Sequence, residues 1–138
     1  MSSSGTRAGE MTVPVSIGEV LDKITILQIK SERLRDEAKL RNVGEELRAL
    51  TQAFDDQFPV LDEEISRLVA ALKAVNETLW EIEDDIRECE RGKSFDARFI
   101  ELARAVYQTN DERAALKREI NVQLGSQLIE EKSYTPYA

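Results

Sequence analysis

Apolar residues recur at steps of three and four along most of this chain, a spacing that predicts four amphipathic helices. The first helix begins at Ser16, which forms a capping box with Glu19, and its apolar residues cover more than one side. The second runs from about residue 36 to 56 and is stopped by Phe58-Pro59, because the residue before proline avoids helical angles. Pro59 itself suits the first turn of a third helix.

The third predicted helix, from about residue 60 to 91, has the clearest pattern in the chain. Its apolar positions follow one another at alternating steps of four and three over four heptads: Leu61, Ile65, Leu68, Leu72, Val75, Leu79, Ile82, Ile86 and Cys89. This helix would be roughly 45 Å long at 1.5 Å per residue, longer than a small globular domain needs. An unbroken heptad seam requires helical partners along its whole length.

A fourth helix is predicted after the break at Gly92; Asp96 caps it, and Gly125 suits a left-handed cap at its end. The short turn before this helix predicts an antiparallel pairing with the third. The expected fold class is therefore all-α: a long antiparallel helical hairpin with two additional N-terminal helices, in a bundle or coiled-coil-like arrangement.

The chain is expected to form one domain with short extensions. Residues 1–12 are predicted to be a flexible leader, residues 13–125 a helical bundle domain, and residues 126–138 a C-terminal tail that docks on the bundle. The first two helices can cover only part of the hairpin, so we predict that a second copy covers the rest in a homodimer. A monomeric four-helix bundle is the alternative.

The charge and composition exclude several classes of function. The net charge is −8 and no dense basic run is present, so neither nucleic acid nor an anionic membrane is an expected partner. The chain has no His, which removes the commonest general base and most zinc sites. The single Cys89 lies on the apolar seam and is expected to be buried there. No signal peptide or membrane span is recognisable, so we expect a cytoplasmic protein.

An acidic stripe on the third helix is a candidate metal site. Its residues follow one another at steps of four, three and four: Glu77, Glu81, Asp84 and Glu88. Some all-α enzymes hold Mg²⁺ or Mn²⁺ with such carboxylates, which suggests a metal-dependent hydrolase or transferase acting on nucleotides or sugar nucleotides. These positions lie farthest from the seam, however, and a solvated outer face is the favoured interpretation. On that interpretation no cofactor is expected.

A second polar group lies beside the seam and is predicted to form a polar layer. When the hairpin is paired about its turn, residues of the third helix face the polar break in the fourth helix, and the first helix adds two more if it docks there. The candidate ligand-binding residues are Asn76, Trp80, Glu83, Arg87, Tyr107, Asn110, Asp111, Arg113, Lys117, Asp22 and Lys23.

Two interpretations of this polar layer are open. The favoured one is a buried layer that fixes helix register and the dimer partner. The other is a pocket for a small polar ligand, in which Arg113 and Lys117 contact an anion and Trp80 or Tyr107 offers a stacking surface. No nucleophile–base pair is recognisable, so no catalytic residue is assigned. The favoured function is a non-enzymatic module that binds a protein partner or a small polar ligand.

Four segments of the sequence resemble a small uncharacterised bacterial family, a domain of unknown function. They are VLDKITILQIK at 20–30, VNETLWEIEDDIR at 75–87, ARAVYQTND at 103–111 and EEKSY at 130–134. The resemblance spans about residues 13–137 and implies an all-helical cytosolic bacterial protein. It supplies no activity and no catalytic residue, although its signature positions coincide with the polar layer. A chorismate-mutase-like enzyme is a third alternative, supported by the fold class alone.

Overall fold

Four helices make up most of residues 8–137. The structure, a computed structural model, describes residues 8–137, so residues 1–7 of the predicted leader lie outside the described residues. The helices are α1 (Ile17–Arg33), α2 (Glu37–Gln57), α3 (Glu63–Arg91) and α4 (Ala97–Gln123). No strand occurs within the described range, which confirms the prediction of an all-helical fold with four helices.

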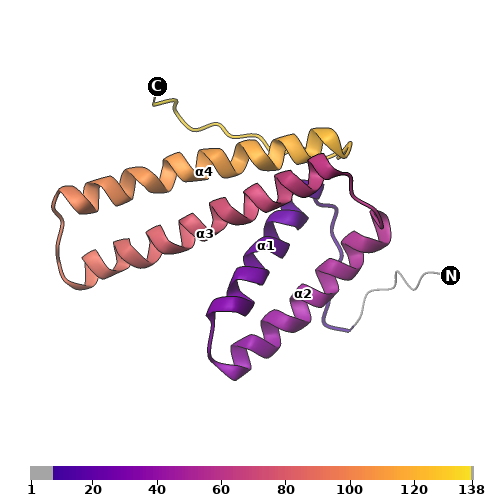
Figure 1. Ribbon diagram of the computed structural model, residues 1–138, viewed down its shortest axis with the longest axis horizontal. Helices are drawn as coiled ribbons and strands as arrows, with labels where there is room; N and C mark the ends of the chain where they lie inside the picture. Colours follow the sequence, from indigo (N-terminus) through magenta and orange to yellow (C-terminus); the bar gives the residue numbers. More distant parts are fainter. Residues whose placement is uncertain (1–7, 138) are drawn as a thin grey trace.

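The two longest helices, α3 and α4, lie side by side and run in opposite directions (Figure 1). The turn between them contains Lys93 in the left-handed region, with φ of 56°. At the other end of this pair, α1 packs against both helices, and α2 lies along the outer side of α1. The helix α1 therefore contacts each of the other three, whereas α2 packs mainly on α1.

Acidic or hydroxyl side chains begin every helix. Ser16, Asp36, Asp62 and Asp96 each accept a hydrogen bond from a backbone N–H in the first turn that follows. The prediction that Pro59 lies in the first turn of the third helix was wrong, because the cap at Asp62, whose carboxylate accepts from the Ile65 N–H at 2.9 Å, sets the start at Glu63.

Other helix ends follow the sequence more closely. Gly125 has φ of 68°, and the N–H groups of residues 124, 125 and 126 bond back to the last turn of α4, as a left-handed cap requires. At the start of α1, the Ser16 hydroxyl accepts from the Glu19 N–H at 3.2 Å. The Glu19 carboxylate accepts from Lys117 instead of completing a capping box.

The core lies where α1 crosses the end of the α3–α4 pair. It joins one buried cluster from all four helices: Leu21, Ile24, Phe54, Leu72 and Ile120. Leu27 and Ile29 of α1 are also buried, so α1 is enclosed on more than one side. This central position makes α1 the helix on which the packing of the others depends.

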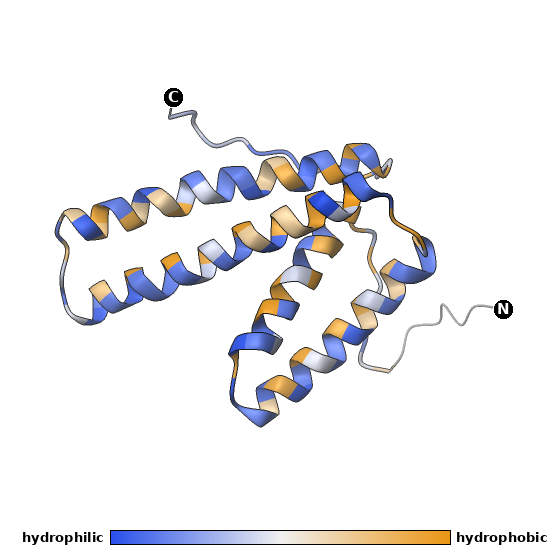
Figure 2. Cartoon of the chain, in the orientation of Figure 1, coloured by the Kyte–Doolittle hydropathy of each residue, from blue (hydrophilic) through white to orange (hydrophobic). Residues whose placement is uncertain are grey.

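The part of the α3–α4 pair farthest from α1 is packed much less tightly. Residues 77–108, hereafter the distal arm, contain one buried residue, Cys89. The α3 seam is fully buried at Ile65 and Leu72 but only half-buried from Leu79 to Ile86. Hydrophobic residues continue along both helices to the turn, beyond the region that α1 covers (Figure 2). The apolar seam of the distal arm therefore stays partly exposed to solvent when only these two helices pack against each other.

Gly18 marks the closest approach between α1 and α4, and it yields a stability prediction. A Cβ at this position would lie 2.6 Å from the Lys117 carbonyl oxygen, a backbone atom that cannot move without shifting α4. We expect Gly18→Ala to lower the free energy of unfolding by about 1–3 kcal/mol through overpacking, measured by urea denaturation.

Gly44→Ala on α2 is the matched control. The nearest atom to its added Cβ is a flexible guanidinium nitrogen of Arg48, at 3.4 Å. This substitution should raise the free energy of unfolding by up to about 1 kcal/mol, because alanine costs less backbone entropy in a helix than glycine does. A Gly18→Ala variant as stable as Gly44→Ala would contradict the close approach.

Candidate functional site

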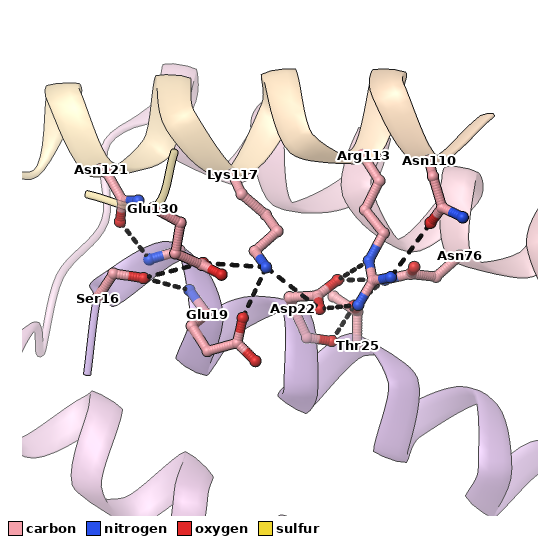
Figure 3. A network of polar contacts seen from close by, with 11 residues as sticks. Ser16, Glu19, Asp22, Thr25, Asn76, Asn110, Arg113, Lys117, Asn121 and Glu130 are labelled. Carbon is pink, nitrogen blue, oxygen red and sulfur yellow. Dashed lines mark hydrogen bonds and ion pairs between the residues drawn. The ribbon is translucent and has the colours of Figure 1, made fainter. Parts of the chain in front are cut away.

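A buried carboxylate is the centre of the polar layer. Asp22 lies on the most apolar helix of the chain, and only 1% of its surface is exposed. Arg113 of α4 binds it with two hydrogen bonds, Nε to Oδ1 at 2.9 Å and a terminal nitrogen to Oδ2 at 2.5 Å (Figure 3). Such a two-pronged, charge-assisted pair holds both side chains in one geometry and joins α1 to α4.

Two further side chains complete the coordination of Asp22. The Asn76 amide of α3 donates to Asp22 Oδ1 and to the Thr25 hydroxyl, both at 2.9 Å. The Thr25 hydroxyl in turn donates to the Asp22 carbonyl at 2.7 Å. Asn110 accepts from Arg113 at 3.4 Å on the outer side of the guanidinium. Within the described residues, no buried side-chain nitrogen or oxygen lacks a hydrogen-bond partner, so the layer is internally satisfied.

Lys117 extends the layer by one turn of α4 towards the N-terminus of α1. Its ammonium group lies 2.6 Å from Glu19, 3.0 Å from Glu130 and 4.0 Å from Asp22. Burial opposes the charged form, but the hydrogen bonds to Glu19 and Glu130 and the charge of Asp22 outweigh it, so the pKa of Lys117 is raised above 10.5. The pKa of Arg113 is also raised, chiefly by its hydrogen bonds to Asp22.

The first turn of α1 is held by polar groups from the end of α4. The Gly18 N–H donates to the Asn121 side-chain oxygen at 2.6 Å, and the Ile17 N–H donates to the Ser126 hydroxyl at 3.2 Å. Ser16 reaches the Glu130 carboxylate at 3.4 Å. These partners satisfy N–H groups that a helix start leaves free, and they fix where α1 begins relative to α4.

The structure brings five of the candidate residues into this layer: Asp22, Asn76, Asn110, Arg113 and Lys117. Sequence reasoning missed Thr25, Asn121 and Glu130. Thr25 had a usable signal, since it is a polar residue one turn after Asp22 on an otherwise apolar helix. Glu130 had none, because nothing in a tail sequence specifies which turn of a helix it will contact.

The other candidates lie elsewhere. Lys23 is exposed and pairs with Glu46 of α2 at 3.1 Å, so the expectation that it joins the layer was wrong; consecutive helical residues point about 100° apart. Arg87 pairs with Glu83 on the surface of α3, and Arg33 lies 6.0 Å from the centre of the Trp80 ring.

Tyr107 and Asp111 line a groove between α4 and the tail. This groove has a volume of about 1010 Å³, and cationic, aromatic and acidic side chains from both elements line it. Asp111 accepts hydrogen bonds from Lys132 and Tyr137, which lower the pKa of its carboxyl group. The groove opens directly beside Arg113 and Lys117, so the layer has one edge at the surface.

Two residues of the acidic stripe on α3 form ion pairs with arginines. Glu81 pairs with Arg33 at 3.4 Å and Glu88 with Arg91 at 2.6 Å, whereas Asp84 is exposed and Glu77 half-buried. Among residues 8–137, no three acidic or cysteine side chains are grouped closely enough to hold a metal ion. The Mg²⁺ or Mn²⁺ alternative stays a prediction.

Comparisons with known proteins match a family model to nearly the whole described chain. A family model described as a family of unknown function (DUF6165) matches residues 11–138, which confirms the resemblance to an uncharacterised family. No curated protein and no solved structure matches the chain. The comparisons therefore supply no activity and no functional residue.

The Asp22–Arg113 pair leads to a prediction about coupling. Arg113→Met should lower the free energy of unfolding by about 3–5 kcal/mol, because it leaves a buried carboxylate without its charged partner. The double variant Asp22→Asn/Arg113→Met should recover a large part of that loss, since neither charge then remains to be buried. A double-mutant cycle by urea denaturation measures this; purely additive losses would refute it. Lys23→Met, on the exposed neighbouring pair, should change stability by no more than about 1 kcal/mol.

The raised pKa of Lys117 predicts a loss of stability at high pH. The folded state holds the Lys117 proton more tightly than the unfolded state, whose pKa is near 10.5. Its contribution is therefore complete below pH 10.5 and declines as the pH rises through the folded pKa. Urea denaturation between about pH 9 and 11.5 should show a shallower decline in the free energy of unfolding for Lys117→Met than for the wild type. Equal slopes would contradict the assignment; Lys73 and Tyr137, whose pKa values are also raised, are common to both proteins.

Proposed function

We propose that this chain, which belongs to the family of unknown function DUF6165, is a non-enzymatic helical interaction module whose distal arm pairs with a second copy. The observation that supports this most directly is the half-buried seam of residues 77–108. There the heptad pattern of α3 continues. Apart from the contacts of Arg33, at the end of α1, with Trp80 and Glu81, only α4 lies beside this arm within residues 8–137 (Figure 1).

A two-helix arm cannot bury a seam of this width by itself. Each helix has an apolar stripe, and in a four-helix bundle that stripe contacts two neighbours, one on either side. At the end of the α3–α4 pair opposite the distal arm, α1 is the third helix. Its packing there accounts for the complete burial of Leu72 and Ile120. In the distal arm a second hairpin of the same length supplies the third and fourth helices.

The charges of the distal arm favour a second copy as its occupant. Its α3 portion is strongly acidic, with seven acids against two arginines between residues 77 and 91. Its α4 portion, from residue 97 to 108, has Arg98 and Arg104 against Glu101. A twofold arrangement in which α3 of one copy lies on α4 of its partner brings opposite charges together, and like helices apart.

Within this proposal the polar layer has a structural role. Arg113 and Lys117 direct their hydrogen bonds to Asp22, Glu19 and Glu130, leaving few donors for a ligand. The layer then fixes α1 at one end of the pair and leaves the other end open for association. A small polar ligand in the layer, and a hydrolase or transferase acting on nucleotides or sugar nucleotides, remain predictions.

The same proposal places the protein in the bacterial cytoplasm. None of the helices within residues 8–137 combines the length with the apolar character needed to cross a bilayer.

The proposed association predicts a specific mass and a specific way to change it. Light scattering after size exclusion should give twice the chain mass of 15.7 kDa. Ile100→Glu should give the single-chain mass with unchanged circular dichroism, because Ile100 is 57% exposed and a charge there affects only the surface that a second copy covers.

Val122→Glu is the matched control. Val122 is a β-branched residue on the same helix with 59% exposure, but it lies at the end of α4 farthest from the distal arm. This variant should keep the doubled mass. A wild-type protein that stays at the single-chain mass up to about 100 µM, a concentration at which dissociation constants in the micromolar range are saturated, would refute the proposal.

A further inference from the structure

The C-terminal tail lies along α4 as an extended strand-like segment that contacts the helix through charged side chains. Glu130 pairs with Lys117 at 3.0 Å and Glu131 with Arg118 at 2.7 Å, so two consecutive glutamates meet two consecutive cations. Further along, Lys132 pairs with Asp111, and the rings of Tyr137 and Tyr107 meet edge to face with their centres 4.9 Å apart.

These contacts hold the tail weakly. Residues 128–137 belong to no helix or strand and are all exposed. In the pair Arg118–Glu131 both side chains are more than half exposed, at 54% and 70%. Exposed ion pairs compete with water and salt and contribute little to stability. The tail is thus placed by charge rather than by burial, which allows it to be displaced.

Open space also remains between the tail and α4. A volume of about 1010 Å³ is open between the tail and α4, and Tyr134, which lines it, is 82% exposed. The lining on α4 runs from Val106 to Asn121, a distance of about 22 Å along a helix. An extended segment of about seven residues has the same length. The dimensions therefore match a peptide better than a compact small molecule.

We propose that this groove on α4 is a docking site for an extended acidic segment of a partner protein, and that the chain's own tail occupies it as a weak internal ligand. The chemistry of the partner follows from the tail. It has two adjacent carboxylates for Lys117 and Arg118, and an aromatic residue about six positions later for Tyr107. This surface is separate from the distal arm, so the inference does not depend on self-association.

A second copy is the less suitable occupant because the tail is tethered beside its own groove. The Ser126 N–H donates to the Asn121 carbonyl at 2.8 Å, and the Ser126 hydroxyl accepts from the Ile17 N–H at 3.2 Å. Exchange of tails between copies would break both contacts. A free acidic segment from another protein has to replace the exposed ion pairs of Glu131 and Lys132 and the pair that Glu130 makes with the largely buried Lys117.

The experiment uses two full-length variants, each of which breaks the ion pair between Arg118 and Glu131 by reversing the charge of one partner. In Glu131→Lys the groove keeps its cation and repels the now basic tail. In Arg118→Glu the groove gains a negative charge and repels the acidic tail. Arg118 is exposed and belongs to no part of the buried layer, so the fold should be retained in both. The probes are fluorescent peptides of residues 126–138, one native and one with Glu131→Lys, followed by anisotropy.

The expected result is a crossed pattern. The Glu131→Lys chain should bind the native peptide about tenfold more tightly than the wild-type chain does, because its own tail no longer competes. The Arg118→Glu chain should bind the peptide with Glu131→Lys and reject the native one. Rescue by the complementary peptide shows that the Arg118→Glu groove is folded. No binding in either matched pair, or equal binding in all four combinations, would overturn the proposal.

One further measurement tests the alternative occupant. The Ile100→Glu variant, which cannot associate through the distal arm, keeps the native tail and groove. It should keep the single-chain mass up to about 100 µM. A dimer of this variant that an added Glu131→Lys substitution dissociates would mean that tails exchange between copies, and it would overturn the assignment to a partner protein.

Discussion

The arrangement of this protein depends on one buried carboxylate and the guanidinium that binds it. A charged group inside a helical bundle is stable only when its lone pairs are filled by fixed donors, and Asp22 has donors from Arg113 and Asn76. Those donors come from α4 and α3, so α1 can neither rotate nor slide without leaving the carboxylate unsatisfied. Hydrophobic contacts hold α1 against α3 and α4, and the polar layer fixes the position and rotation at which α1 packs.

The layer also separates two parts of the molecule with different roles. On one side of it, α1, α2 and the proximal halves of α3 and α4 form a closed core. On the other side, the seam of the distal arm is only half-buried. The stability of the protein therefore resides at one end, which leaves the remaining surface available for association.

Most of the helices and part of the polar layer could be predicted from the sequence. The helices depend on local signals, whereas the polar layer depends on how separate helices pack. Heptad spacing and caps are local, so the helices and the left-handed Gly125 followed directly from the pattern. A short turn fixes how the third and fourth helices pair, so the polar residues of the third helix could be expected to face the polar break in the fourth. The direction in which Asp22 and Lys23 point depends on how α1 rotates against two other helices, and no local pattern encodes that. The contact of Glu130 with Lys117 was unpredictable for the same reason.

The distance along the chain between the two charges of the buried pair affects how the protein folds during synthesis. Asp22 and Arg113 are 91 positions apart, and a ribosome adding roughly 5–20 residues per second needs roughly 5–18 s to bridge that interval. The most apolar helix is thus made first, and its counter-charge emerges among the last residues of the bundle. Until then α1 has an exposed apolar surface with an unpaired carboxylate in its middle, which disfavours premature burial of that face.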